Sequence, residues 1–289
     1  SLPQSESKVR ELFAEITPML DFFESTVGPY PFGDEKMGVV ETPHKGMEHQ
    51  TINAYGNEYA KTSFGYDDLM QHEFAHEWFG NQLTNANWDD MWLHEGLGTY
   101  MQPLYMQYLR GDQEYFASLQ QHRAAIRNKA PIVAGKPMTE EQVYDLDKGG
   151  PGLDIYMKGS LVMHTLRGLV GDEVFLRTVR EIVYGTPDPR PGSLAPRYGT
   201  TREFIDIANR NSGKDLNWFF QAYLYQAALP ELKATRQGDT LQLAWKLEKN
   251  TPFPMPVEVR VGDKLVTVPM IDGRGSVTVP AGATYTLDP

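Results

Sequence analysis

Apolar side chains recur at helical spacing through most of the first 230 residues, and residues 7–27 are the first clear case. The apolar face of this segment consists of Val9, Leu12, Phe13, Ile16, Leu20 and Phe23. Pro18 is expected to break or kink the helix near its middle, because proline removes an intrahelical hydrogen bond. Gly28 and the Pro/Gly cluster through Gly33 are expected to end it.

A second helical stretch runs from Asp67 to about Lys129. Either Asp67 or Asp68 can cap its first helix, and Gly80 can end that helix. Two short β-like runs precede this stretch and flank a loop at residues 43–46: Met37–Val40 and Gln50–Ala54.

The next helix in this stretch can begin at Asp89 or Asp90, either of which could cap it. It contains Gly96 and Gly98, which are poor helix formers; close packing and a kink are both open explanations. A proline-rich segment, 187–196, is typical of an exposed loop. Further helices are expected at residues 154–170, 172–184, 201–209 and 216–225.

After Pro230 the pattern changes from helical spacing to strict alternation, as in Val257-Glu258-Val259-Arg260-Val261. Gly238-Asp239 and Gly262-Asp263 are typical of two-residue hairpin turns. The sequence therefore predicts an α+β protein with a mostly helical part at residues 1–230 and a small antiparallel β domain at residues 231–289.

Composition excludes several classes of protein and site. The 289 residues allow about two domains, and the 40% hydrophobic content supports buried cores. The net charge of −11 and the pI near 5.1 argue against a nucleic-acid partner. Cysteine is absent, which excludes disulfides and thiolate metal sites and leaves cytoplasm and periplasm equally open. No apolar run approaches the roughly 18 residues that span a bilayer, so no transmembrane segment is expected.

The most informative stretch of the chain is His72-Glu73-Phe74-Ala75-His76. Two histidines four residues apart on a helix project from one face, so both imidazoles can bind one metal ion. Glu73 can lie beside that ion without binding it and take a proton from the water that the ion activates. An ordinary amphipathic helix with two hydrogen-bonded histidines is the alternative interpretation.

Glu95, within Trp92-Leu93-His94-Glu95-Gly96, offers a carboxylate on a second helix. Two histidines and one glutamate leave a fourth position open for water, which is the form of a catalytic zinc site. The sequence therefore predicts a zinc hydrolase with one Zn²⁺ per chain, bound by His72, His76 and Glu95.

Several separated motifs together resemble the aminopeptidase N family of zinc metallopeptidases. In family order and spacing, across roughly residues 5–230, they are Gly46-Met47-Glu48, the stretch from His72 to Asn81, the stretch from Trp92 to Gly96, and Tyr156-Met157-Lys158-Gly159. Residues 218–231 also resemble the family's transition from helical domain to β-sandwich. The resemblance implies a thermolysin-like catalytic domain of the gluzincin type at residues 1–230, followed by an antiparallel β-sandwich domain at residues 231–289.

The resemblance also implies a role for each matching residue. His72, His76 and Glu95 would bind zinc, and Glu73 would be the general base. Tyr156 would donate a hydrogen bond to the developing oxyanion.

Glu48, with Gly46 and Met47, falls in the motif that binds the free α-amino group of a peptide. A fixed carboxylate facing an ammonium is what an exopeptidase needs to select the chain end. The sequence departs here from the family's commonest pattern, Gly-Ala-Met-Glu-Asn, with Lys45-Gly46 for Gly-Ala and His49 for Asn. A surface carboxylate at a strand edge is the alternative reading of Glu48.

Asp90 could orient a zinc-binding imidazole or cap its helix, and both roles stay open. Four other histidines lack metal spacing and are expected to be ordinary polar or packing residues: His44, His94, His122 and His164.

These residues predict a zinc aminopeptidase acting on peptides with a free N-terminus. The alternatives are a zinc endopeptidase, a related hydrolase of non-peptide substrates, and a silent family member that serves as an interaction module. Glu48 argues against the endopeptidase, and the intact ligand set argues against the silent module. The family normally places a large β-rich domain before the catalytic domain, whereas 45 residues precede Gly46. We therefore expect a fragment or a short member with an incomplete site.

Overall fold

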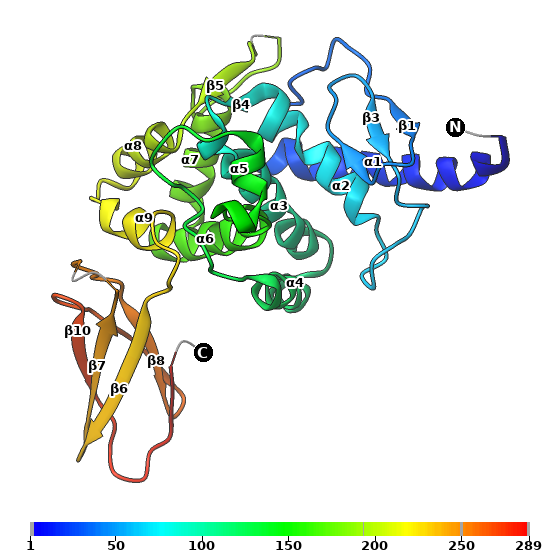
Figure 1. Ribbon diagram of the computed structural model, residues 1–289. Coiled ribbons are helices and arrows are strands. Elements are labelled where there is room, and N and C mark those ends of the chain that lie inside the picture. Colours follow the sequence, from blue (N-terminus) through cyan, green and yellow to red (C-terminus); the bar gives the residue numbers. More distant parts are fainter. Residues whose placement is uncertain (1–2, 193, 249–250, 288–289) are drawn as a thin grey trace. The chain divides into compact units, whose positions relative to one another are not determined.

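A computed structural model of the protein describes residues 3–192, 194–248 and 251–287. The chain divides into two compact units, Ser1–Lys214 and Asp215–Pro289 (Figure 1). The helices of the first unit are α1 (Glu6–Thr26), α2 (Asp68–Ala75), α3 (Trp92–Arg110), α4 (Asp112–Ala125), α5 (Glu140–Tyr144), α6 (Asp154–Val170), α7 (Asp172–Tyr184) and α8 (Thr201–Ser212). Its strands are β1 (Val39–Glu41), β2 (Gly46–Met47), β3 (Asn53–Tyr55), β4 (Leu83–Asn85) and β5 (Arg197–Gly199).

Helix α1 runs without interruption through Pro18, so the predicted break at this proline is wrong. Leu12 is buried on one side of Pro18, and Met19, Phe22 and Phe23 are buried on the other. Burial of these apolar side chains on both sides offsets the loss of one backbone hydrogen bond.

Where the first unit is described, two small sheets accompany its helices. In the order β1-β3-β2, β1 is parallel to β3 and β2 is antiparallel to it. The two predicted β-like runs are confirmed, with strands shifted by up to three residues. The predicted loop at 43–46 is shorter than expected, because Gly46 and Met47 form the outer strand β2 opposite Tyr55 and Ala54. The parallel pair of β4 with β5 joins segments far apart in sequence and was not predicted.

Helix α3 packs most extensively against α6 and α4, and the predicted helices at 154–170 and 172–184 are confirmed. The contact between α3 and α6 is closest at two glycines. A Cβ added at Gly159 would lie 2.8 Å from the Gly96 Cα. Close packing therefore explains why a poor helix former occupies position 96, one residue after Glu95 and within a continuous helix.

The close contact between Gly96 and Gly159 predicts a loss of stability when a methyl group is added there, and a second glycine of α6 provides the control. Gly159→Ala is expected to destabilise the protein by about 1–3 kcal/mol, because the added methyl overpacks the α3–α6 contact. Gly168→Ala lies on the same helix with nothing within 4 Å of the added Cβ. That variant is expected to be neutral or to stabilise by about 0.5–1 kcal/mol, since alanine is the better helix former. Urea unfolding compares the two, and equal stability of both variants would contradict the close contact.

Asp89 and Asp90 do not cap α3, so that prediction is wrong for both residues: α3 has no side-chain N-cap. Asp89 accepts hydrogen bonds from the backbone N–H groups of Ala134 and Gly135, at 2.7 and 2.8 Å. Asp90 accepts one from the backbone N–H of Thr201, the first residue of α8, at 2.7 Å. The two carboxylates therefore hold distant segments against the start of α3.

The described residues of the second unit form α9 (Asn217–Tyr223) and six strands. The strands are β6 (Glu231–Gln237), β7 (Thr240–Lys246), β8 (Val257–Val261), β9 (Lys264–Val268), β10 (Arg274–Thr278) and β11 (Tyr285–Leu287). They form two three-stranded antiparallel sheets, in the orders β10-β7-β6 and β11-β8-β9. Both predicted two-residue hairpin turns are confirmed, at Gly238-Asp239 and Gly262-Asp263.

The two sheets share one apolar core. Leu241 and Leu243 of β7 contribute to it from one sheet, and Val257 and Val259 of β8 contribute from the other. The second unit is thus a small β-sandwich, and the predicted α+β fold class is confirmed. The strands begin at Glu231, whereas α9 belongs to the same compact unit as the strands. The division into functional domains at residues 1–230 and 231–289 stays a prediction.

Two further expectations concern segments outside the site. The proline-rich segment 187–196 has no helix or strand where it is described, and Ser193 lies outside the described residues. Among the helices that the structure describes, none is long and apolar enough to cross a membrane.

Candidate active site

The candidate metal-binding motif begins on α2 and ends in the wide turn that follows it. Asp67 caps α2 by accepting a hydrogen bond from the Met70 N–H, as predicted. His76 lies just beyond the end of the regular helix, and a π-helical turn at Glu77–Gln82 follows. This turn brings the Phe79 carbonyl to 2.8 Å from the Nδ1 of His76. Since a carbonyl can only accept, Nδ1 carries a proton and donates to it, which leaves Nε2 as the nitrogen that can bind a metal ion in place of a proton.

Three potential ligand atoms converge from α2, its terminal turn and α3. The Nε2 atoms of His72 and His76 are 3.1 Å apart, and Glu95 Oε2 lies 3.3 and 3.4 Å from them. Ligands about 2.0–2.1 Å from a tetrahedral ion are separated by roughly 3.3–3.4 Å. His76 and Glu95 are 1% and 4% exposed. The donor atoms and their spacing therefore fit a zinc ion.

The electrostatics of the site favour a cation. Burial by itself would lower the pKa of His76, but the carboxylates of Glu95, Glu48 and Glu73 outweigh it and raise that pKa to about 10. Burial would likewise raise the pKa of Glu95, but the His76 and His72 imidazoles hold it well below its usual range. The site thus stabilises positive charge at His76, whether a proton or a metal ion provides it.

Glu73 lies beside the converging atoms without joining them. It is 5% exposed, and its Oε2 has no hydrogen-bond partner among the described residues. Burial raises the pKa of this carboxyl, against the lowering effect of His76 and His72, which makes Glu73 a stronger base than an exposed glutamate. Gly46 of β2 packs directly on it, since an added Cβ would overlap Glu73 Oε1. Met47, next on the strand, is 46% exposed.

Two tyrosine hydroxyls reach the other oxygen of Glu95. The Tyr156 hydroxyl donates to Glu95 Oε1 at 2.8 Å, and the Tyr144 hydroxyl donates to the same atom at 3.3 Å. Burial and the charge of Glu95 raise the pKa of Tyr156, so its hydroxyl stays protonated and remains a donor. The structure therefore brings Tyr156 to the site. Tyr144 adjoins it from α5, a short helix that the sequence pattern did not predict.

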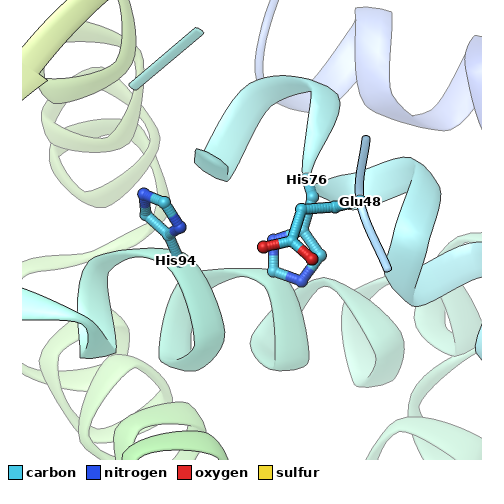
Figure 2. Close-up of side chains that lie close together, drawn as sticks. All are labelled: Glu48, His76 and His94. Carbon is cyan, nitrogen blue, oxygen red and sulfur yellow. The ribbon is translucent and has the colours of Figure 1, made fainter. Parts of the chain in front are cut away.

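Glu48 enters the site from the end of β2. Asn81 Nδ2 donates to its backbone carbonyl at 3.0 Å. Figure 2 shows the Glu48 carboxylate beside the His76 imidazole, with His94 on α3; one potential ligand atom from each of the three lies within 4.8 Å of the others. The Asn85 N–H donates to His94 Nε2 at 3.0 Å, so Nδ1 of His94 carries the proton. In this tautomer Nε2 already accepts a hydrogen bond and Nδ1 carries the proton, so neither ring nitrogen offers a free lone pair to a metal ion.

The sequence pattern assigned no site role to His94. Burial and the neighbouring His76 lower the pKa of its imidazole to about 4, which favours the uncharged ring. Its Nδ1 has no partner among the described residues. Of the other histidines without metal spacing, His122 pairs with Ser160 Oγ at 2.9 Å and His164 pairs with the Tyr115 hydroxyl at 2.6 Å.

Asp90 bonds to α8 and not to a site imidazole, so the proposed orienting role is wrong.

Comparisons with known proteins identify the family of this chain. The sequence profile of the peptidase family M1 domain matches residues 17–223. The chain belongs to peptidase family M1. Membership confirms the resemblance to the aminopeptidase N family that the separated motifs indicated.

Individual relatives of this family-M1 chain cover different parts of it. Aminopeptidase N of Lactococcus lactis subsp. lactis is 27% identical over 184 residues, which are 62% of this chain and 20% of that protein. Aminopeptidase A of Legionella pneumophila, solved in complex with aspartic acid, shares the fold with a TM-score of 0.75 at 20% identity, over 99% of this chain and 34% of that one.

A third relative is an M1 zinc metallopeptidase from Deinococcus radiodurans, one structure of which contains a Tyr-Ser-Ala substrate. It superposes with a TM-score of 0.59 at 25% identity, over 75% of this chain and 45% of that one. The chain therefore spans less than half the length of each of these three relatives.

Proposed function

We propose that this chain is a zinc aminopeptidase that removes the N-terminal residue of peptides, with one Zn²⁺ held by His72, His76 and Glu95. The observation that carries the proposal is the Glu48 carboxylate, which lies within 4.8 Å of a His76 ring nitrogen. A negative group this close to the His76 imidazole can hold a substrate's ammonium beside the first peptide bond. The names of two of the relatives, aminopeptidase N and aminopeptidase A, agree with this activity.

The metal supplies one part of the chemistry. A zinc ion held by His72, His76 and Glu95 would act as the Lewis acid of the reaction, polarising the scissile carbonyl and lowering the pKa of a water to about 7. The fixed Nδ1–H of His76 orients its imidazole for this role.

Glu73 and Tyr156 supply the proton transfer and the hydrogen bond to the oxyanion. Glu73 accepts the proton of the attacking water and passes it to the leaving amine, and its raised pKa suits both steps. Tyr156, which stays protonated, donates its hydroxyl to the oxyanion that develops on the substrate carbonyl.

Glu48 and β2 position the substrate. Strand β2 is the outer strand of its sheet, so one edge of Gly46 and Met47 faces away from β3 and can bind an extended peptide backbone. Glu48 then fixes the ammonium at the end of that backbone, which restricts cleavage to the first peptide bond. An endopeptidase would not need this carboxylate, because it does not bind the free amino terminus of its substrate.

A panel of aminoacyl chromogens, each compared with its N-acetylated form, tests the proposed activity. Free-amine substrates should be hydrolysed and acetylated ones should not, because acetylation removes the charge that Glu48 recognises. Hydrolysis of both forms would indicate an endopeptidase or another hydrolase, and hydrolysis of neither would indicate a silent family member.

Glu48→Ala and Glu48→Gln are expected to raise KM for free-amine substrates by about 10–100-fold, the value of a hydrogen bond to a charged group. Glutamine keeps the side-chain shape, so an equal effect in both variants assigns the loss to charge. Glu173→Ala removes an exposed carboxylate from α7 and should leave KM unchanged. Unchanged discrimination between free and acetylated substrates in the Glu48 variants would remove Glu48 from the amine site.

A further inference from the structure

Two tyrosines share one oxygen of the proposed metal ligand Glu95. Tyr156, in the first turn of α6, donates to Glu95 Oε1 at 2.8 Å, and Tyr144, the last residue of α5, donates to it at 3.3 Å. The Tyr144 ring also lies edge-on to the Trp88 ring, with centroids 6.5 Å apart. Both hydroxyls are thus directed at an acceptor that one of them alone could satisfy.

The chain between the two tyrosines is fixed by its own hydrogen bonds. Thr139 and Gln142 form a capping box that begins α5. The Gly152 N–H donates to the Val143 carbonyl at 3.0 Å, which ties the start of α6 back to α5. Gly150 packs so closely on α5 that an added Cβ would overlap the Gln142 carbonyl. These contacts therefore hold the segment that carries Tyr144 in place.

Tyr156 cannot serve both of its acceptors at once. A hydroxyl has one proton to donate, and in the structure Tyr156 gives it to Glu95. In the proposed reaction the same proton must point to the oxyanion of the substrate. Glu95 Oε1, on a carboxylate that is almost fully buried, would then lose its shorter hydrogen bond.

We propose that Tyr144 is a positioning residue that takes over Glu95 Oε1 when Tyr156 turns to the substrate. The Tyr144 hydroxyl needs to approach by only about 0.5 Å to reach the usual O–H···O distance. Tyr144 thereby keeps Glu95 oriented toward the metal during turnover. This handover, in which Tyr144 replaces Tyr156 as the donor to Glu95 Oε1, rests on the proposed function. The anchoring of Glu95 by two hydroxyls does not.

Zinc affinity tests the anchoring without reference to activity. Tyr144→Phe, Tyr156→Phe and the double variant are compared by competition with a chromophoric chelator. The zinc affinity of each single variant should stay within a few-fold of the parent's, because the remaining hydroxyl holds Glu95. The double variant should bind it about 10–100-fold more weakly, as expected when a ligand loses its hydrogen-bonding partners. Parent-like affinity in the double variant would overturn the anchoring.

Steady-state kinetics at saturating zinc test the handover. Tyr144→Phe should lower kcat about tenfold, with KM little changed, because Glu95 loses its support only when Tyr156 leaves it. In the Tyr156→Phe background, Tyr144→Phe should leave kcat unaltered. Glu95 Oε1 then lacks both hydroxyl donors before the reaction as well as during it. Equal loss in both backgrounds would overturn the handover.

Tyr198→Phe, which changes an exposed tyrosine on β5, is the control and should keep parent values in both measurements. Absence of peptide hydrolysis by the parent chain would remove the proposed function and the handover with it. The zinc competition would still decide whether the two hydroxyls anchor Glu95.

Discussion

Replacing Glu73 by glutamine is expected to leave zinc bound and to remove nearly all peptide hydrolysis. The amide keeps the shape of the side chain but cannot take up the proton of the attacking water. General acid–base groups contribute on the order of 10²–10⁴ in rate, so kcat should fall at least into that range. Metal analysis and hydrolysis of an aminoacyl chromogen, on the same preparation, measure the two effects.

Glu77→Gln is the matched control for this change. Glu77 is also buried and lies four residues further along, where its Oε2 accepts a hydrogen bond from the Tyr30 hydroxyl at 3.1 Å. Glutamine can accept the same bond, so activity should stay close to that of the parent. Parent-like turnover in Glu73→Gln would reject the general-base role. Loss of zinc in that variant would indicate that Glu73 is itself a ligand.

Glu95→Ala is expected to lose stoichiometric zinc together with activity. Two imidazoles remain, but the carboxylate that completes the three-ligand set is gone. The affinity should fall by at least on the order of 100-fold, the upper range for losing only an outer hydrogen-bonding partner. Dialysis against a weak chelator followed by metal analysis measures it, with Glu73→Gln as the zinc-retaining comparison. Retention of one tightly held zinc in Glu95→Ala would reject the ligand assignment.

Long periodic elements of the fold could be predicted from sequence, because each follows a local pattern. Helix α7 and the hairpin at Gly238-Asp239 depend on residues that are neighbours in the chain. Strands β4 and β5 could not be predicted, because three-residue segments more than a hundred residues apart carry no periodicity of their own. Asp90 shows the same limit, since a sequence cannot reveal that a carboxylate bonds to the N–H of Thr201 on another helix.

The same distinction applies to the candidate site. The spacing of His72 and His76 is local helix geometry, and Glu95 was predicted as the third ligand from its carboxylate on the next helix. The family motifs added Glu48 and Tyr156. Tyr144 had no such signal, because α5 has only five residues and contacts Glu95 through tertiary structure alone. His94 also escaped prediction, since adjacent helix positions point in different directions and its approach to His76 and Glu48 depends on tertiary structure.

Zinc titration of the metal-free chain, followed by the initial rate on an aminoacyl chromogen, tests the central claim most directly. We expect a rate that rises with added zinc and levels off at one equivalent per chain, while the N-acetylated chromogen remains uncut throughout. A rate that does not respond to zinc, or equal cleavage of the acetylated substrate, would contradict the assignment of a zinc aminopeptidase.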